Sequence, residues 1–318
     1  MSPMDRLPAV VALGGGHGLA ASLRALRRVT SDLTAVVTVA DDGGSSGRLR
    51  AQFDILPPGD LRMALAALCG DDREGRIWAD VLQSRFGGDG PLAGHAIGNL
   101  LIAGIWERLG DHVSGLDMVG KLLGVQGRVL PMAAVPLDIE ADVIGVDPLY
   151  PDEVTRVRGQ ARVAKCPGMV RQVRLLPDAP GACPETVQAV LDADHVVLGP
   201  GSWFTSVLVH LLVPDLAEAI VTTKAQRILT MNLVAADETA GLSASEHLEV
   251  LAEHAPRLRL DTIVCDPTYA DGDAHLPKYA ASLGAELLVT PVRASDGSPR
   301  HDVNRLASVY ADLMGRLG

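Results

Sequence analysis

The sequence contains few aromatic residues and few cysteines. Aromatic side chains make up 3% of the 318 residues, so alanine, valine and leucine supply most of the apolar surface. The four cysteines are widely scattered and form no CxxC pair; they are Cys69, Cys166, Cys183 and Cys265. This spacing favours neither a structural zinc site nor a disulfide framework.

Long basic runs and long apolar runs are also missing. The net charge is −11, and no block of lysine or arginine is long enough to follow a nucleic-acid backbone, so we expect no nucleic-acid partner. No run of about 18 apolar residues occurs. The apolar stretch near the start is too short for a signal peptide. We therefore expect a cytoplasmic protein without membrane insertion.

Short valine-rich runs alternate with segments rich in alanine and leucine. The valine-rich runs, which predict strands, lie at 7–13, 33–40, 195–199, 226–231, 260–265 and 285–290. The segments that predict helices lie at 18–28, 184–193, 202–220, 243–254, 275–283 and 302–316. Strands separated by helices predict a parallel sheet with right-handed crossovers. The fold class is therefore α/β, with a Rossmann-like, mostly parallel sheet flanked by helices.

Two segments interrupt this alternation. Residues 58–124 have a helical composition and predict a subdomain of three or four helices. Residues 127–176 contain short valine-rich runs broken by proline and glycine, which predicts a small antiparallel β insertion. No repeat and no linker occurs, so we expect residues 1–318 to form a single domain.

Two glycine-rich loops follow predicted strands. Gly14–Gly18 opens a helix, where free backbone N–H groups and the helix dipole can hold a phosphate. Gly199–Ser202 repeats the arrangement later in the chain, and both loops should open towards the same edge of the sheet. The glycine spacing departs from the dinucleotide fingerprint because the third position is Leu19, so NAD is not inferred.

A polar segment follows the predicted strand at 33–40. Asp41 and Asp42 could hold a ribose hydroxyl or Mg²⁺. The loop residues Ser45, Ser46 and Arg48 could contact phosphate oxygens. A solvated turn, with the first aspartate as a cap, is the simpler alternative.

Further polar residues could close the cleft. Asn232 lies just beyond a predicted strand, and Glu238 follows shortly after it. His95 and Asn99 are four residues apart at the start of a helix, where they either face the cleft or have a structural role. Asp60, preceded by two prolines and a glycine, indicates by itself a helix N-terminus.

Several longer strings occur together in a specific order. They are GGGHGL, ADDGGSSGRLR, DILPPGDLR, GHAIGNLLIAG, RVLPM, LGPGSWFTSVLVHLLVP and ETAGLSASEHL. Over about residues 8–310 the chain resembles the YvcK-like gluconeogenesis factor family, within the CofD-like superfamily of 2-phospho-L-lactate transferases. The resemblance implies UDP-sugar binding and a link to cell shape and cell-wall growth on gluconeogenic carbon. It attaches no settled reaction to this branch.

The resemblance also implies site residues. The implied ligand contacts are Gly14, Gly15, Gly16, Asp41, Asp42, Ser45, Asn99, Gly201, Ser202 and Glu238, with Arg300 as a further phosphate contact. From the residues themselves we add Ser46, Gly199 and Asn232. His17, at the phosphate loop, stands where the family usually has threonine, and Asp237 stands where glycine is common.

Three functions from different classes compete at this point. The first is a regulatory protein that binds a UDP-sugar or a related nucleotide, with a homo-oligomer and cell-wall regulatory proteins as expected partners. The second is a Mg²⁺-dependent transferase of a phospholactyl-type group, resembling 2-phospho-L-lactate transferase. The third, a dinucleotide oxidoreductase, is disfavoured by the glycine spacing.

Overall fold

Seven parallel strands form the central sheet of the computed structural model, which describes residues 6–315. The strands are β1 (Val10–Gly14), β2 (Leu33–Val37), β3 (Arg128–Pro131), β7 (His195–Leu198), β8 (Gln226–Thr230), β9 (Thr262–Cys265) and β10 (Glu286–Val289). Strands β1, β7 and β9 are buried along their whole length, as valine-rich runs in a parallel sheet should be. The predicted Rossmann-like α/β fold is confirmed.

The order of the strands contains a reversal. The sheet order is β10-β9-β8-β7-β1-β2-β3, so the chain moves from β1 outwards to β3 and later returns to β7 on the opposite side of β1. In open α/β sheets, ligands bind in the crevice beyond the carboxyl ends of the strands where the order reverses. That place lies between β1 and β7.

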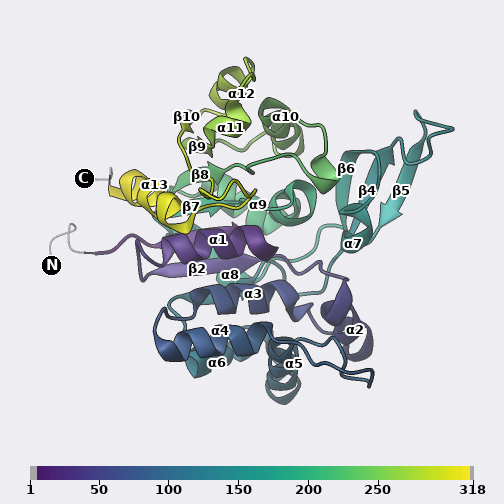
Figure 1. Ribbon diagram of the computed structural model, residues 1–318, viewed down its shortest axis with the longest axis vertical. Helices are drawn as coiled ribbons and strands as arrows, with labels where there is room; N and C mark the ends of the chain where they lie inside the picture. The colour runs from purple at the N-terminus through teal and green to yellow at the C-terminus, as the bar shows by residue number, and fades with distance from the viewer. Residues whose placement is uncertain (1–5, 316–318) are drawn as a thin grey trace.

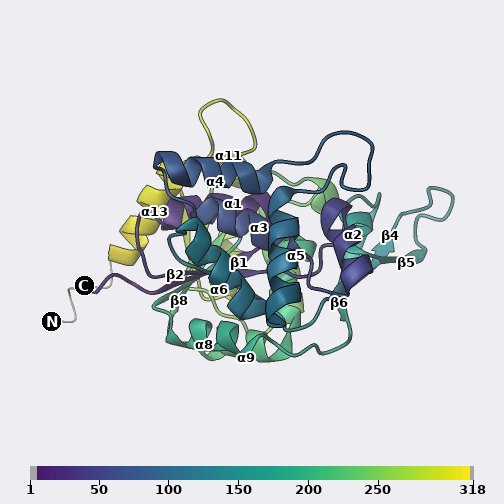
Figure 2. The ribbon, with the colours of Figure 1, turned by 90° about the horizontal axis from the view of Figure 1, so that it is seen from below.

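Helices cover both faces of this sheet (Figure 2). One face carries α1 (Gly16–Leu26), α3 (Pro58–Leu68) and α13 (Val303–Gly315), and the other carries α8 (Pro184–Asp192) and α9 (Pro214–Thr222). The remaining helices of the upper part in Figure 1 are α10 (Ala244–His254), α11 (Pro267–Ala270) and α12 (Leu276–Ser282).

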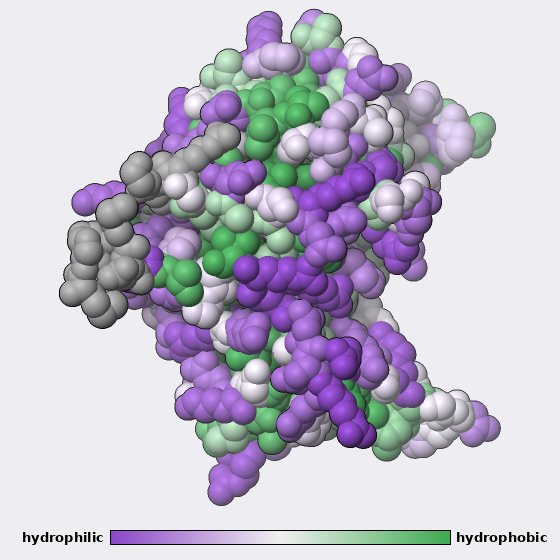
Figure 3. Space-filling view, turned by 60° about the vertical axis from the view of Figure 1, so that its left-hand side comes forward, coloured by the Kyte–Doolittle hydropathy of each residue, from purple (hydrophilic) through white to green (hydrophobic). Residues whose placement is uncertain are grey.

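The predicted helical subdomain is present as four helices. Besides α3 it consists of α4 (Arg73–Gln83), α5 (Ile97–Leu109) and α6 (His112–Leu123), which lie at the bottom of Figure 1. Helix α3 packs directly against α1, so these helices extend one layer of the main fold. On the face seen in Figure 3 the outline narrows between this helical part and the rest, and hydrophilic side chains cover the narrowing.

The antiparallel insertion is shorter than predicted. The expected range 127–176 begins with β3, which pairs in parallel with β2 and closes the main sheet. The insertion consists of β4 (Asp138–Ile144), β5 (Val154–Arg158), α7 (Gln160–Val163) and β6 (Met169–Leu176), with the strand order β5-β4-β6. Composition could not separate β3 from the insertion, because both contain short valine-rich runs.

Two predicted segments differ in detail. The segment expected to be a loop after Asp42 forms helix α2 (Gly44–Phe53), since its second half carries good helix formers. The helix expected over 202–220 is broken into a π-helical turn (Trp203–Val207), a 3-10 turn (Leu208–Leu212) and α9. The break precedes Pro214, which lacks the N–H needed to continue a helix.

No single helix among residues 6–315 is long and apolar enough to cross a membrane. The two segments Trp203–Leu212 and Pro214–Thr222 reach that length and composition only when they are taken as one, and they are bent by 84°.

A buried chain of hydroxyl groups joins α13 and β8 to α1. The hydroxyl of Tyr310 lies 2.8 Å from Oγ1 of Thr230 and 3.1 Å from Oγ of Ser22. Because Ser22 donates to the carbonyl oxygen of Gly199 at 3.0 Å, the chain ends on the second glycine-rich loop. Burial raises the pKa of Tyr310 to about 12. The hydroxyl chain therefore connects the packing of α13 with the position of that loop.

Replacing this tyrosine should weaken the fold. Tyr310→Phe removes the central hydroxyl, which leaves Thr230 without this buried partner and Ser22 with only its bond to Gly199, so the free energy of unfolding should fall by about 1–2 kcal/mol. Urea unfolding measures the loss. Tyr150→Phe is the control, because Tyr150 is 61% exposed and its change should be close to zero. Equal stability of the two variants would contradict the role of the hydroxyl chain.

Candidate functional site

The two glycine-rich loops meet at the reversal point of the sheet. They follow β1 and β7, which are neighbours in parallel register. A Cβ atom on Gly18 would overlap the carbonyl oxygen of Pro200 and would lie 2.7 Å from the Cα atom of Gly201. The predicted meeting of the loops at one edge is therefore observed, and glycine is required for it.

The N-terminus of α1 offers backbone donors at this contact. Gly15 precedes the helix in an extended conformation and has no side chain to cap the first turn, and the Asp60 carboxyl faces the Gly16 N–H. The φ angle of Gly16 is +56°, a left-handed value that favours glycine. The first N–H groups of a helix carry the positive end of its dipole and suit an anion. His17, the next residue, is exposed.

Asn232 holds the second loop in place. Its Oδ1 accepts from the Gly201 N–H at 3.0 Å, and its Nδ2 donates to the Gly201 carbonyl oxygen at 2.9 Å. The side-chain amide of Asn232 thus bonds to both the N–H and the carbonyl oxygen of a single loop residue, Gly201. Ser202 is exposed beside it. Asn232 thus positions the loop, and Ser202 is the hydroxyl that a ligand could reach.

Glu238 acts on the segment that follows this loop. It is 4% exposed, and its Oε1 accepts from the N–H groups of Phe204 at 2.7 Å and Thr205 at 3.2 Å. Burial raises its pKa to about 7. The carboxyl therefore caps the turn that begins after Ser202, and its contact with a ligand would be indirect.

Asp41 and Asp60 form a carboxylate pair beside the first loop. A Cβ atom on Gly15 would lie 2.6 Å from Oδ2 of Asp60, and one on Gly59 would lie 2.7 Å from Oδ2 of Asp41. Burial, and then the charge of Asp41, raise the pKa of Asp60 to about 7. The sequence had suggested only a helix cap at Asp60. The glycine before it, which has no room for a side chain, was the available signal.

Asp42 lies apart from this pair. Its Oδ1 accepts from the Ala161 N–H at 2.8 Å, at the start of α7, and a Cβ atom on Gly159 would overlap its Oδ2. The carboxylate therefore connects the end of β2 to the β insertion. The two adjacent aspartates, which the sequence placed in one Mg²⁺ site, have different surroundings.

Ser45, Ser46 and Asn99 form a buried polar cluster between α2 and α5. Nδ2 of Asn99 donates to Oγ of Ser45 at 3.1 Å and to Oγ of Ser46 at 3.5 Å. Oγ of Ser45 also lies 3.0 Å from Nδ1 of His95. All four side chains are at most 6% exposed. The cluster joins the helical part to the loop that carries Asp41, and it leaves Ser45 little freedom to contact a ligand.

A cavity of about 530 Å³ opens on the other side of the α1 N-terminus. Its lining includes His17, Gly18, Arg24 and Arg300. Burial and the charge of Arg27 lower the pKa of Arg24. The exposed Arg300 pairs with Asp296 at 2.9 Å, so it can exchange this partner for a ligand at little cost. The cavity therefore contains two arginines, with Asp302 also in its lining, and adjoins the glycine-rich turn of α1.

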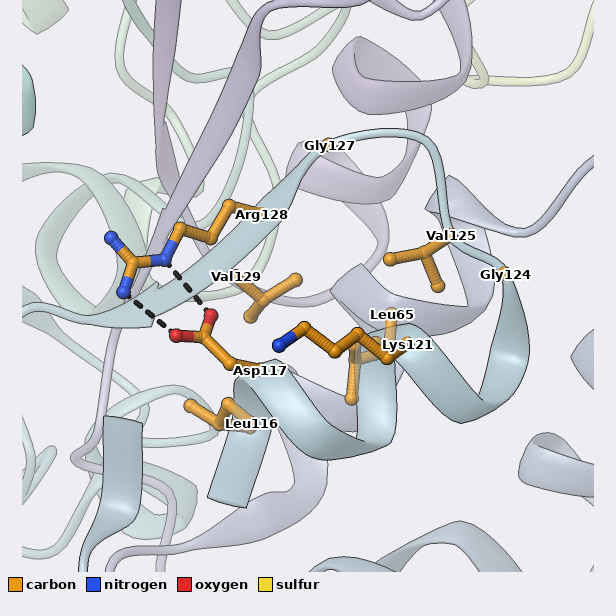
Figure 4. A pocket seen from close by; sticks show the side chains of 10 residues that line it. Leu65, Leu116, Asp117, Lys121, Gly124, Val125, Gly127, Arg128 and Val129 are labelled. Carbon is orange, nitrogen blue, oxygen red and sulfur yellow. Dashed lines mark hydrogen bonds and ion pairs between the residues drawn. The ribbon is translucent and has the colours of Figure 1, made fainter. Parts of the chain in front are cut away.

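A smaller cavity of about 330 Å³ lies between α6 and the beginning of β3 (Figure 4). Asp117 and Arg128 form a two-pronged ion pair across it, with N–O distances of 2.9 and 2.8 Å. It lies at the amino end of a strand, whereas the glycine-rich loops follow the carboxyl ends. We therefore place the candidate site at the loops.

The candidate site can hold an anion and, beside it, a divalent cation. No group of three or more histidine, cysteine or acidic side chains suited to a metal ion occurs in the described part of the chain. Asp41 and Asp60 offer oxygen ligands of the kind that Mg²⁺ prefers, and the metal's other ligands would include water or phosphate oxygens. The fold and the site together define a Rossmann-like α/β protein with a candidate anion-binding site at the carboxyl ends of its central strands.

Comparison with known proteins gives the family. The family model described as 2-phospho-L-lactate transferase CofD matches residues 10–293, and the chain belongs to this family. It is 33% identical over 327 residues to the gluconeogenesis factor of Bacillus subtilis (strain 168), covering 98% of this chain and 99% of that protein. It is thus a gluconeogenesis factor homologue.

Two further relatives agree with this assignment. A protein of Mycobacterium tuberculosis (strain ATCC 25618 / H37Rv), provisionally named a gluconeogenesis factor, is 54% identical over 311 residues, covering 96% of this chain and 90% of that protein. The crystal structure of a UPF0052 family member from Bacillus halodurans superimposes with a TM-score of 0.82 at 32% identity, covering 95% of this chain and 98% of that one.

The contact between the two loops can be tested with a single methyl group. Gly18→Ala places a Cβ atom against the backbone of Pro200, which cannot move without displacing β7, so stability should fall by about 1–3 kcal/mol in urea unfolding. Gly104→Ala in α5 is the matched control, because its Cβ atom would meet open space. The control should be neutral or more stable by up to about 1 kcal/mol.

The Asp60 carboxyl should make stability depend on pH. An acid whose pKa is raised on folding stabilises the native state fully at about pH 4 and below, and this contribution is lost as the pH rises to about 7. Asp60→Asn should therefore melt at a higher temperature than the wild type at pH 8, with a smaller difference at pH 5. Asp89→Asn, at an exposed loop position, should show no such trend. A Tm difference independent of pH would refute the raised pKa.

Proposed function

We propose that the cleft binds a nucleoside diphosphate compound of the UDP-sugar class, and that the protein is a nucleotide-sugar-binding regulator linked to cell shape and cell-wall growth. The observation that carries the proposal is the N-terminus of α1, where glycine occupies the N-cap position, in direct contact with the loop at Gly201 at the reversal point of the sheet. The gluconeogenesis factors to which the chain is similar support the regulatory part.

The charge of the protein supports binding by short-range donors. With a net charge of −11, the long-range field repels a diphosphate, so local donors must hold it. The N–H groups of α1 and the hydroxyl of Ser202 lie at the two loops. Arg24 and Arg300 line the adjoining cavity, which offers space for the remainder of the nucleotide. These donors together balance the two phosphates.

Mg²⁺ fits the residues on the opposite side of α1. Asp41 and Asp60 would hold it, because burial and then the charge of Asp41 disfavour the ionised Asp60 carboxyl, and a divalent cation would offset both effects. A bound Mg²⁺ would neutralise phosphate charge. Without it, the carboxylate of Asp60 would compete with a phosphate for the same loop, since its Oδ2 lies beside Gly15.

A Mg²⁺-dependent transferase of a phospholactyl-type group is the second candidate. The family description and the Asp41–Asp60 pair favour it, because a carboxyl with a pKa near 7 suits proton transfer. The two candidates differ in turnover. A regulator binds its ligand and releases it unchanged, whereas a transferase consumes it in the presence of an acceptor.

A ligand panel with and without Mg²⁺ tests the proposal. UDP-glucose at about 100 times its Kd should add about 2.7 kcal/mol of stability in a thermal-shift assay, and more with Mg²⁺ than without, whereas NAD should add none. Asp41→Asn should abolish the Mg²⁺-dependent part, and the exposed control Asp89→Asn should retain it. Chromatography of the ligand after incubation separates the two candidates. Absence of any shift with UDP-sugars would refute the proposed function.

A further inference from the structure

Two arginines flank His95 without forming ion pairs. Nη2 of Arg48 donates to the carbonyl oxygen of Ala93 at 3.0 Å, and Nη1 of Arg85 donates to that of Gly94 at 2.8 Å. Within residues 6–315 neither guanidinium pairs with a carboxylate. Both side chains are exposed, so their remaining N–H groups are free. Because the two carbonyl groups that hold them belong to adjacent residues, one bound anion could contact both cations.

The hydrogen bonds of Ser45 fix the proton on His95. Oγ of Ser45 accepts from Nδ2 of Asn99 at 3.1 Å and from the Ala96 N–H at 3.4 Å, so its own hydrogen can go to Nδ1 of His95 at 3.0 Å. A neutral imidazole that accepts at Nδ1 carries its proton on Nε2.

The protonated Nε2 atom of His95 is a free donor. In the part of the chain that the structure describes, it forms no hydrogen bond, although the side chain is 6% exposed. Burial, and then the charges of Arg48 and Arg85, lower the pKa of the ring, which favours its neutral form. This N–H donor therefore lies near two guanidinium groups that are bonded to the carbonyl oxygens of Ala93 and Gly94.

A chain of contacts connects His95 to the acidic pair beside the first glycine-rich loop. Asn99 contacts both Ser45 and Ser46, and Ser46 lies against Gly59, where Oδ2 of Asp41 also lies. The contacts thus run from the acidic pair through the buried serines and Asn99 to His95. A ligand held at α1 by its phosphates would have to pass over the acidic pair, outside these buried side chains, to reach this position.

We propose that Arg48, Arg85 and His95 form a second anion subsite, which recognises a carboxylate or phosphate at the end of the ligand remote from the nucleotide. The inference rests on the proposed function, and it narrows the ligand class. The preferred compound is a nucleoside diphosphate sugar with an additional acidic group. A nucleoside diphosphate with a neutral sugar would still place its phosphates at α1 and the acidic pair. It would leave both arginines without an anionic partner.

UDP-glucuronic acid and UDP-glucose form a matched pair for the test, since they differ only in a carboxylate and a hydroxymethyl group. Isothermal titration with Mg²⁺ should give the wild type a preference of about tenfold or more for the acid, as expected for charge-assisted hydrogen bonds. The double variant Arg48→Gln, Arg85→Gln should reduce the ratio of affinities to about one. Arg108→Gln, which removes an exposed arginine of α5, should retain the full ratio.

The outcomes separate this inference from the proposed function. Equal affinities in the wild type, or a preference that survives in the double variant, would overturn the subsite while leaving UDP-sugar binding intact. Failure of both compounds to bind would overturn the proposed function. In that case a titration with a simple anion, which carries no nucleotide, tests the subsite on its own.

The nucleotide-free measurement is ¹⁵N NMR of the His95 ring. The free protein should show the Nε2–H tautomer, and inorganic phosphate or malonate should shift its Nε2 signal. The anion that causes the larger shift shows whether the subsite prefers phosphate or carboxylate. The double variant should show the same tautomer and no shift. A wild-type ring that carries its proton on Nδ1, or that responds to neither anion, would overturn the inference.

Discussion

The close approach of two backbone segments governs the geometry of this protein. Gly18 in the first turn of α1 lies against Pro200 and Gly201, with no room for a Cβ atom between them. Because one segment follows β1 and the other follows β7, the contact joins the two halves of the sheet where its strand order reverses. Larger residues would separate the loops and remove the place where a phosphate can meet both.

Much of the surrounding polar structure maintains that contact without touching a ligand. Asn232 uses both ends of its amide on Gly201, and Glu238 caps the turn that follows Ser202. The hydroxyl chain from Thr230 through Tyr310 ends on the carbonyl oxygen of Gly199. Polar residues near a cleft can thus be essential for binding although their own donors and acceptors are already used within the protein.

The sequence predicted the elements whose signals are local. Glycine runs after valine-rich strands located both loops, and the alternation of strands and helices predicted the parallel sheet. It could not assign Asp60, because an acid after proline and glycine at a helix start is explained equally well by the helix dipole. It also grouped Asp41 with Asp42. Both residues follow the end of β2 at Val37, outside the strand, where side-chain alternation gives no direction, so only the structure separates their surroundings.

The charged side chains around the candidate site alternate in sign. Arg24 and Arg300 lie on one side of the α1 N-terminus, and Asp41 and Asp60 lie on the other. Beyond the acidic pair, the charge becomes positive again at Arg48 and Arg85. An anion alone would be repelled in the middle of such a cleft, and a cation alone at both ends. A phosphate at α1 with a divalent cation beside it matches this alternation, because each charge then lies next to its opposite.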